Sequence, residues 1–340
     1  MSITTETKPI PEDAGARRPR RRGRWLSWTV TTFFALWAIV RVGGLEQGSF
    51  PTQLMTMTPY AVVLALLTAL LVVRRNRPAA AVALAACLAL AATVAPRAFS
   101  APADSVHASS GTPQAAGAPL RVLTVNLFGR ADAQAVVKLV REYRPDVFSA
   151  LELTPESVTE LDAAGLGTLM PHRVLQADWG ATGSGLFAKH PLAPLDDLFT
   201  PIGHNMPAAT LTLPAGERVQ VAAIHPNPPL GRMEAEWNAA LDAFPSASPD
   251  VIRVLAGDFN ASLDHRAMRD LLDRGYADAA DQVGKGLVPT WPNGRKIPPI
   301  ITIDHVLADR RVSVTQVEIL DVPGTDHRGV FADLRLPSTL

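Results

Sequence analysis

The sequence predicts a mixed α/β domain that follows a bundle of about three transmembrane helices. Three almost uninterrupted apolar stretches occupy residues 25–40, 54–73 and 79–95. From residue 120 onwards, short apolar runs alternate with segments of helical periodicity, which is the pattern of sheets covered by helices. A chain of 340 residues has room for one domain of about 200 residues beside the apolar region.

The apolar stretches are long enough to cross a bilayer. Twenty helical residues, at a rise of about 1.5 Å each, match a hydrocarbon core of roughly 30 Å. We expect spans at about 25–45, 54–73 and 79–97, the second of them free of charged residues. Extension of the first span to Leu45 places Arg41 near one end, where its side chain can snorkel to the interface. The third stretch is short and rich in alanine, so an interfacial or re-entrant helix is its alternative.

The distribution of arginine predicts the orientation of the protein. Residues 1–24 form a basic tail, and the turn at 74–77 contains three further arginines, whereas the loop at 46–53 has no Lys or Arg. Because basic loops stay in the cytoplasm, the tail is expected inside the cell and residues 120–340 outside it. A cleaved signal peptide would explain only the first apolar stretch, so a multi-pass cell-membrane protein is favoured.

The segment between the membrane region (25–97) and the α/β domain is expected to be an exposed linker. Residues 98–119 are rich in Ala, Pro, Ser and Gly and contain few large apolar residues. The one cysteine of the chain, Cys87, lies in the third apolar stretch. The α/β domain therefore has no thiol for a disulfide, a cysteine zinc site or a cysteine nucleophile.

The charge of the α/β domain disfavours nucleic acid as a partner. The chain as a whole is neutral, but residues 1–119 have a net charge of +7. Residues 120–340 contain 20 Lys and Arg against 27 Asp and Glu, a net charge of −7. Nucleic-acid binding draws much of its affinity from basic residues that neutralise phosphates. An acidic domain at a membrane instead favours a small or lipid-linked phosphate as the substrate.

Each expected element of the domain has its own signal. The helix expected at 132–143 has an i, i+3, i+4, i+7 apolar stripe, and Pro145 stops it. A second helix at about 231–244 has a similar apolar face. Asp264 can cap a third helix, which ends at Gly275. Strands are expected at about 121–127, 147–151, 184–188, 209–213, 218–224, 251–256, 300–307, 314–320 and 330–336.

Six short polar signatures fall at the ends of strand-like runs. One carboxylate or imidazole at a strand end is common, but six in order provide what a phosphoester site with a hard metal needs. Carboxylate and amide oxygens suit Mg²⁺, with Mn²⁺ as an alternative, and His–Asp pairs can move protons and bind phosphate. The signatures are Val125-Asn126, Leu151-Glu152, Ile224-His225, Gly257-Asp258-Phe259-Asn260, Ile303-Asp304-His305 and Thr325-Asp326-His327.

Several of these residues, taken alone, have structural explanations. Asn126 could form a turn, and Glu152 could be an acidic residue at a helix start. His225 precedes a proline-rich loop and could be a surface histidine, although hydrogen bonding to a phosphoryl oxygen suits it better. Asp258 and Asn260 form the most specific pair, because an adjacent glycine permits close backbone approach.

The Asp326-His327 pair is expected to work with Asp304. A carboxylate that is hydrogen-bonded to a histidine fixes its tautomer and raises its basicity. We expect Asp304 to be this partner of His327, and Asp326 to face the metal. His305 should point to the other side of its strand and is left out of the site. Trp291 could stack on a substrate or pack its loop.

The order and spacing of these motifs resemble the endonuclease/exonuclease/phosphatase superfamily, which includes DNase I-like nucleases, neutral sphingomyelinases and inositol polyphosphate phosphatases. The resemblance covers about residues 120–340 and depends most on the motifs at 257–260 and 325–327. It implies a four-layer α/β sandwich, in which two packed β-sheets are flanked by helices. The chain departs from the family pattern at Leu151, where many members have Gln, and at Thr302, where Arg is frequent.

The resemblance also implies a metal-dependent phosphohydrolase, with Glu152 as the principal metal ligand. The expected ligands are Asn126, Glu152 and Asp326. The expected catalytic residues are His225, Asp258, Asn260, Asp304 and His327. Whether Asp258 or His327 takes the proton from water, and whether one or two metals bind, stays open.

Three spans followed by an outward domain resemble the teicoplanin-resistance membrane proteins of this superfamily. This likeness implies a cell-envelope lipid phosphate as substrate, such as undecaprenyl pyrophosphate or a cell-wall precursor. The expected partners are the lipid bilayer and a phosphorylated substrate. A surface-tethered nuclease and a non-catalytic binding domain stay open as alternatives. The sequence gives no indication of the oligomeric state.

Overall fold

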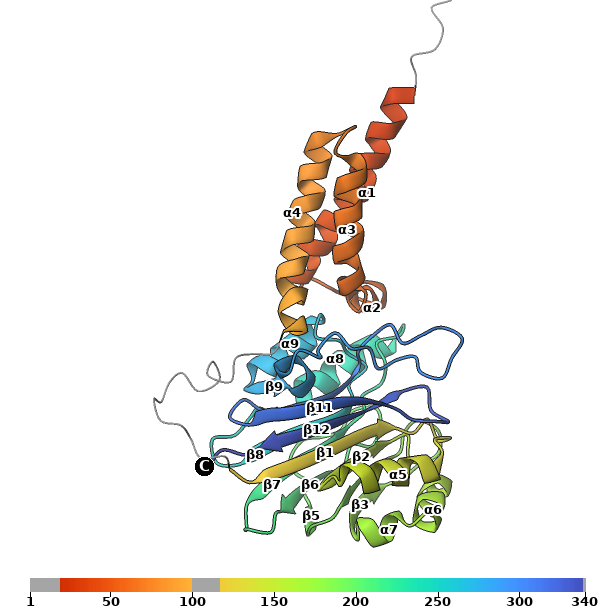
Figure 1. The fold of residues 1–340 in the computed structure, drawn as a ribbon, viewed down its shortest axis with the longest axis vertical. Coiled ribbons are helices and arrows are strands. Elements are labelled where there is room, and N and C mark those ends of the chain that lie inside the picture. Colours follow the sequence, from red (N-terminus) through yellow and green to blue (C-terminus); the bar gives the residue numbers. More distant parts are fainter. Residues whose placement is uncertain (1–18, 100–116, 339–340) are drawn as a thin grey trace, which may run out of the picture.

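The computed structural model describes residues 19–99 and 117–338 and contains two parts that pack end to end (Figure 1). A bundle of apolar helices stands on a larger α/β domain. Most of the expected basic tail and most of the expected linker lie outside the described residues.

The N-terminal part consists of three long helices and one short one. They are α1 (Pro19–Gly43), α2 (Ser49–Met55), α3 (Thr58–Val72) and α4 (Arg77–Val94), which continues into the 3-10 turn η1 (Ala95–Ala98). Among the described residues, two helices are long and apolar enough to cross a membrane, at Arg24–Gly43 and Arg77–Ala98. The number rises to three if α2 and α3 together count as one broken span.

The expected span at 54–73 is not one straight helix. The chain bends by 78° between α2 and α3. Pro59 lies in the first turn of α3, where its missing N–H is tolerated. α3 alone has 15 residues, about 22 Å of helix, and is shorter than a hydrocarbon core of roughly 30 Å. The second expected stretch is therefore a bent helix pair, either a broken span or a re-entrant loop, whereas α4 is an uninterrupted helix.

The α/β domain contains two six-stranded sheets, in the orders β11-β12-β1-β2-β4-β3 and β5-β6-β7-β8-β10-β9. β1 and β2 are parallel, as are β7 and β8, and all other neighbours are antiparallel. The strands are β1 (Pro119–Asn126), β2 (Val147–Leu151), β3 (His172–Gln176), β4 (Ser184–Ala188), β5 (Leu192–Pro194), β6 (Ala208–Thr212), β7 (Arg218–Ile224), β8 (Ile252–Asp258), β9 (Tyr276–Asp278), β10 (Asp304–Asp309), β11 (Ser313–Asp321) and β12 (Arg328–Arg335).

Helices cover the outer faces of both sheets. α5 (Ala133–Tyr143), α6 (Pro155–Ala163) and α7 (Leu166–Leu169) share a core with the first sheet. α8 (Met233–Ala243) and α9 (Arg266–Asp273) share a core with the second. A third core lies between the sheets, and the short α10 (Ala279–Gln282) closes one side of it. The four-layer sandwich is therefore confirmed.

Alternation along the strands decides which residues reach the space between the sheets. In β1, Leu120 and Val122 face the second sheet, whereas Leu123 and Val125 pack under the helices. The same period of two puts Asn126 on the inner face, at the end of the strand. In β8, Ile252, Val254 and Ala256 face the space between the sheets, and the same alternation puts Asp258 on the inner face at the end of the strand.

Asp264 and the strand expected at 300–307 differ from expectation. α9 begins after His265, and no side chain caps it. Gly275, with a φ of 104°, does follow its end as expected. The chain at 300–303 forms only an isolated bridge, and β10 starts at Asp304.

Asp264 instead joins the α/β domain to the bundle. Its Oδ1 atom accepts hydrogen bonds from Arg41 Nε at 2.7 Å and Arg97 Nη2 at 2.9 Å, and its Oδ2 atom accepts one from Arg97 Nη1 at 2.9 Å. All three side chains are buried. Arg41, for which the sequence predicts a position at the membrane interface, is buried and paired with a carboxylate of the α/β domain.

Candidate active site

The polar signatures meet at one edge of the two sheets. β1 and β8 end at Asn126 and Asp258, and His225 follows the end of β7, which is parallel to β8. Asp304 is the first residue of β10 and His327 directly precedes β12, so both lie at strand starts rather than strand ends. Because β10 is antiparallel to β8, and β12 to β1, these strand starts lie at the same edge, where Asp304 pairs with Asp258.

Asn126 connects two carboxylates. Its Nδ2 atom donates to Glu152 Oε1 at 3.0 Å and to Asp258 Oδ2 at 3.2 Å. Its Oδ1 atom accepts the backbone N–H of Phe128 at 3.0 Å. In this arrangement Asn126 orients the carboxylates, and its oxygen could bind a metal only after the amide turned over.

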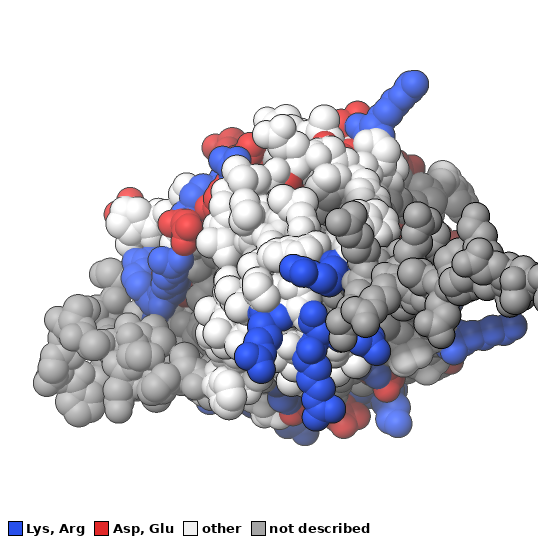
Figure 2. All heavy atoms as spheres, turned by 90° about the horizontal axis from the view of Figure 1, so that it is seen from above, with Lys and Arg blue, Asp and Glu red and all other residues white. Residues whose placement is uncertain are grey.

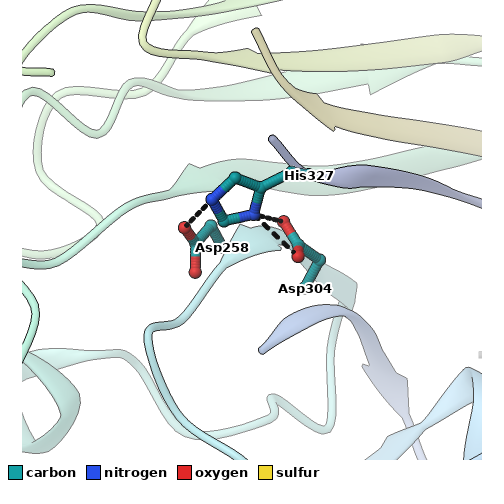
Figure 3. Close-up of side chains that lie close together, drawn as sticks. All are labelled: Asp258, Asp304 and His327. Atoms are coloured by element: carbon teal, nitrogen blue, oxygen red, sulfur yellow. Dashed lines mark hydrogen bonds and ion pairs between the residues drawn. The ribbon is translucent and has the colours of Figure 1, made fainter. Parts of the chain in front are cut away.

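His327 lies between two carboxylates (Figure 3). Its Nδ1 atom is 3.1 and 3.0 Å from the two oxygens of Asp304, and its Nε2 atom is 3.7 Å from Asp258 Oδ2. Burial lowers the pKa of His327, but the charges of Asp304 and Asp258 outweigh burial and raise this pKa to about 10. The imidazole is therefore charged at neutral pH.

Asp258 is the most perturbed carboxyl group of the site. Burial, followed by the charge of Asp304, raises the pKa of Asp258 to about 7. Its Oδ1 atom accepts the backbone N–H of Asn260 at 2.8 Å, and Asn260 Nδ2 donates to the carbonyl of Pro226 at 3.1 Å. Asn260 thus links Asp258 to the loop that follows His225.

A second histidine accompanies His225. The Nδ1 atoms of His204 and His225 are 3.2 Å apart. The Nε2 atom of His225 faces Glu152 Oε1 at 3.9 Å and Asp258 Oδ2 at 3.8 Å. Burial, then the charges of His204 and His327, hold the pKa of His225 well below its usual range. His225 is therefore neutral near pH 7.

Asp326 lies beside His327 with one oxygen free. Its Oδ2 atom accepts from Arg295 Nη2 at 2.7 Å and from Trp291 Nε1 at 3.3 Å. Its Oδ1 atom is buried, has no hydrogen-bond partner among residues 19–99 and 117–338, and is 3.9 Å from His327 Nε2. A buried carboxylate oxygen without a partner is costly unless a cation or water satisfies it. Trp291 does more than pack its loop, because it anchors this carboxylate.

The available donors fit a divalent cation at Glu152 and Asp326. Burial raises the pKa of Glu152. Asp258, Asp304 and His327 also offer donor atoms within 4.8 Å of one another. There, however, a charged imidazole already lies between the two carboxylates, and an imidazolium has no lone pair for a metal. Glu152 and Asp326 are the other carboxylates that line the pocket.

Three residues of the site have a left-handed backbone. Phe128, Glu152 and Asn260 have φ angles of 52°, 49° and 48°. Side chains other than glycine rarely adopt this conformation, which costs on the order of 1–3 kcal/mol and is concentrated at functional sites. In the described part of the chain, Arg144 at the end of α5 is the one other non-glycine residue with a positive φ.

The site opens into a pocket of about 480 Å³ that has three kinds of wall. Asn126 and Asp304 support the pocket from beneath without lining it. The polar wall consists of Glu152, His204, His225, Asp258, Asn260, Asp326 and His327. The apolar wall of the α/β domain consists of Phe128, Ala181, Pro228, Pro229, Leu230, Trp291, Ile301 and Ile303. Helix α2 and the turn before α3 contribute Gln53, Thr56 and Met57.

Two packed sheets with carboxylates, an amide and histidines at one shared edge define a class of phosphoester hydrolases. Residues 123–327 match the Endonuclease/Exonuclease/phosphatase family, and the chain belongs to this family. A comparison with curated proteins gives no match.

Solved structures share the fold at low sequence identity. A humanized TDP2 of D. rerio has a TM-score of 0.53 and 18% identity over 64% of this chain and 98% of that one. An endonuclease/exonuclease/phosphatase from Beutenbergia cavernae has a TM-score of 0.49 and 20% identity over 64% and 72%. The 3′ phosphatase NExo from Neisseria, bound to a product DNA hairpin, has a TM-score of 0.48 and 20% identity over 63% and 98%.

The sequence does not predict that His204, Arg295 or residues 53–57 belong to the site. His204 follows no strand-like run, and Arg295 lies in a loop among other polar residues. Gln53 ends the loop at 46–53, and residues 54–57 begin an apolar stretch whose composition indicates a membrane and gives no sign of a pocket.

Proposed function

We propose that this protein is a membrane-anchored, metal-dependent phosphohydrolase that acts outside the cytoplasm on a lipid-linked phosphoester or diphosphate. The observation that carries the proposal is the pocket itself. Its polar wall gathers carboxylates and histidines of the domain that matches the family, and another wall comes from the N-terminal helical bundle. A substrate with a phosphate at one end and a hydrocarbon chain at the other matches both walls.

The distribution of arginine along the bundle supports an outward domain. The α/β domain packs against the end of the bundle that carries Arg41 and Arg97. Arg74, Arg75 and Arg77 belong to the connection from α3 to α4 and the start of α4, at the end of the bundle away from the α/β domain (Figure 1). Several basic side chains are visible on the molecule when it is viewed from above, that is, from this end (Figure 2). Basic residues that stay in the cytoplasm would place this far end inside the cell.

The residues of the pocket have distinct roles in the proposed reaction. His225, which is neutral, would donate a hydrogen bond to a phosphoryl oxygen. His327, held charged by Asp304, would stabilise negative charge that develops in the transition state. Asp258, held by Asn126 and Asn260, would orient water for in-line attack and accept its proton. We assign Asp258 rather than His327 as the base, because an imidazolium cannot accept a proton.

Glu152 and Asp326 would hold a divalent cation, for which we propose Mg²⁺ or Mn²⁺. When bound, the cation neutralises charge on the phosphoryl oxygens as a Lewis acid. Asn126 would keep the Glu152 carboxylate in position.

A direct comparison of substrates tests the proposed function. The full-length protein in detergent should release phosphate from a prenyl diphosphate when Mg²⁺ or Mn²⁺ is present, and chelation should stop the release. It should nick plasmid DNA poorly at physiological salt, because a domain with a net charge of −7 repels a polyanion. Efficient DNA cleavage without release of phosphate from the lipid would support a tethered nuclease instead.

A further inference from the structure

The membrane helices take part in the pocket of the α/β domain. Gln53 and the turn residues Thr56 and Met57, which connect α2 to α3, line it together with the carboxylates and histidines. They lie beside the loop at 228–230, to which Gln53 Nε2 donates a hydrogen bond at the carbonyl of Pro229, so both parts of the molecule line the pocket. A pocket formed by the α/β domain alone would lack this wall.

Several polar contacts hold α2 in place. Thr52 accepts a hydrogen bond at its carbonyl from His265 Nε2 at 2.9 Å. Ser49 Oγ donates to the carbonyl of Pro229 at 2.9 Å and accepts the N–H of Gly231 at 2.8 Å, which ties α2 to the neighbouring loop. The buried Arg41–Asp264–Arg97 cluster fixes the ends of α1 and α4 beside it. Breaking one partner of a buried ion pair is costly, so the wall is a fixed part of the structure.

The pocket is polar at one end and apolar at the other. Glu152, Asp258 and His327 form the polar end, whereas Met57, Leu230 and neighbouring prolines form the apolar end. The apolar end continues onto α3, where Tyr60 donates a hydrogen bond to the carbonyl of Ile300 at 2.8 Å, next to the pocket wall.

The exposed side of α3 extends this apolar path. Tyr60, Leu64, Leu67 and Leu71 are exposed and spaced by three or four residues, so they share one helix face. This face runs from the edge of the pocket towards the far end of the bundle.

We propose that residues 53–57 form a binding site for the hydrocarbon chain of the substrate, which leaves the pocket along the exposed face of α3. This inference rests on the proposed function. It adds where the hydrocarbon chain of the substrate lies and which residues select it. Chain length would then contribute to specificity through contacts that a short soluble phosphoester does not make.

Matched methionine variants test the site in the full-length protein. Met57→Gln keeps the volume of the side chain but makes the wall polar. Met233→Gln makes the same change on α8, outside the pocket. We expect Met57→Gln to lower kcat/KM for a long-chain prenyl diphosphate about fivefold and for a short-chain one less than about twofold. Met233→Gln should change neither.

A cross-linking experiment gives a second measurement that does not depend on the variants. A long-chain prenyl phosphonate with a photoreactive group on its chain should label residues 53–57 and 228–230, and an unlabelled long-chain diphosphate should compete. Labelling confined to other lipid-facing segments, or equal effects of Met57→Gln on both chain lengths, would overturn the hydrocarbon site and leave the proposed function standing. Turnover of a soluble phosphoester without turnover of any prenyl diphosphate would overturn the proposed substrate class itself.

Discussion

His327 Nδ1 lies 3.0 Å from Asp304 Oδ2, and both side chains are buried. The two residues are 23 positions apart and lie at the starts of β10 and β12, which belong to different sheets. The contact therefore joins the two sheets at their polar edge. The charge of Asp304 also raises the pKa of Asp258, so Asp304 acts on both His327 and Asp258.

Asp304→Asn should lower kcat by about 10²–10⁴-fold with little change in KM, because His327 loses the carboxylate that holds its charge and orientation. Steady-state kinetics on a soluble phosphoester would measure this effect. Asp273→Asn is the control, since that side chain is 81% exposed and far from the pocket wall. An Asp304→Asn enzyme with unchanged kcat would remove His327 from the reaction.

Glu152→Gln should reduce metal-dependent turnover by roughly 10³-fold, because the variant loses the charge that binds the cation while it keeps the shape of the side chain. Metal titration by calorimetry would show weaker binding. Glu152 is only partly buried, so the free energy of unfolding should change by less than about 1 kcal/mol. Glu156→Gln, on an exposed turn of α6, should behave as the wild type. Undiminished metal affinity in the Glu152 variant would refute the assignment.

His305 should make the stability of the domain pH-dependent. Both ring nitrogens face acceptors, Asp278 Oδ2 at 2.8 Å and the carbonyl of Ala261 at 2.8 Å, and only a charged imidazole can donate from both. Burial lowers the pKa of His305, but the hydrogen bond and charge of Asp278 outweigh it and raise this pKa.

The folded-state pKa of His305 thus lies above the unfolded value of about 6.5. The stabilisation is complete below that unfolded value and is lost as the pH rises through the folded-state pKa. In detergent, the difference in Tm between the wild type and His305→Gln should be larger at pH 6 than at pH 9. A difference that grows with pH would contradict a charged His305.

The orientation can be measured with reporters at the C-terminus. Alkaline phosphatase fused after Leu340 should be active, and a fluorescent protein that folds only in the cytoplasm should stay dark, because the arginines place the opposite end of the bundle inside. The same pair of reporters fused after residue 75 should give the reverse result. A fluorescent fusion after Leu340 would mean that the apolar helices cross the membrane an even number of times.

Strand periodicity and turn chemistry explain how much of the site the sequence could predict. Asn126, His225 and Asp258 come directly after apolar strands, and inner-face alternation in the structure puts all three at the same edge. Neighbours on a strand point to opposite faces, which predicts that His305 lies outside the site. In the structure His305 binds Asp278 on the outer side of the sheet. These inferences need only local pattern.

The parts that were missed depend on contacts between distant segments. Arg41 and Asp264 are separated by 223 positions, and nothing near either residue identifies the other. The bend between α2 and α3 had a local signal in Pro59, but apolar composition suggested an uninterrupted span. His204 reaches the site from a loop, whose path is not determined by periodicity.

The Arg41–Asp264–Arg97 cluster has a consequence for biogenesis. During synthesis both arginines emerge long before Asp264, and neither has a carboxylate partner until the α/β domain has folded beside the bundle. If the α/β domain fails to fold, the two cations at this end of the bundle stay without that carboxylate partner. The cluster therefore makes completion of one half of the protein detectable in the other.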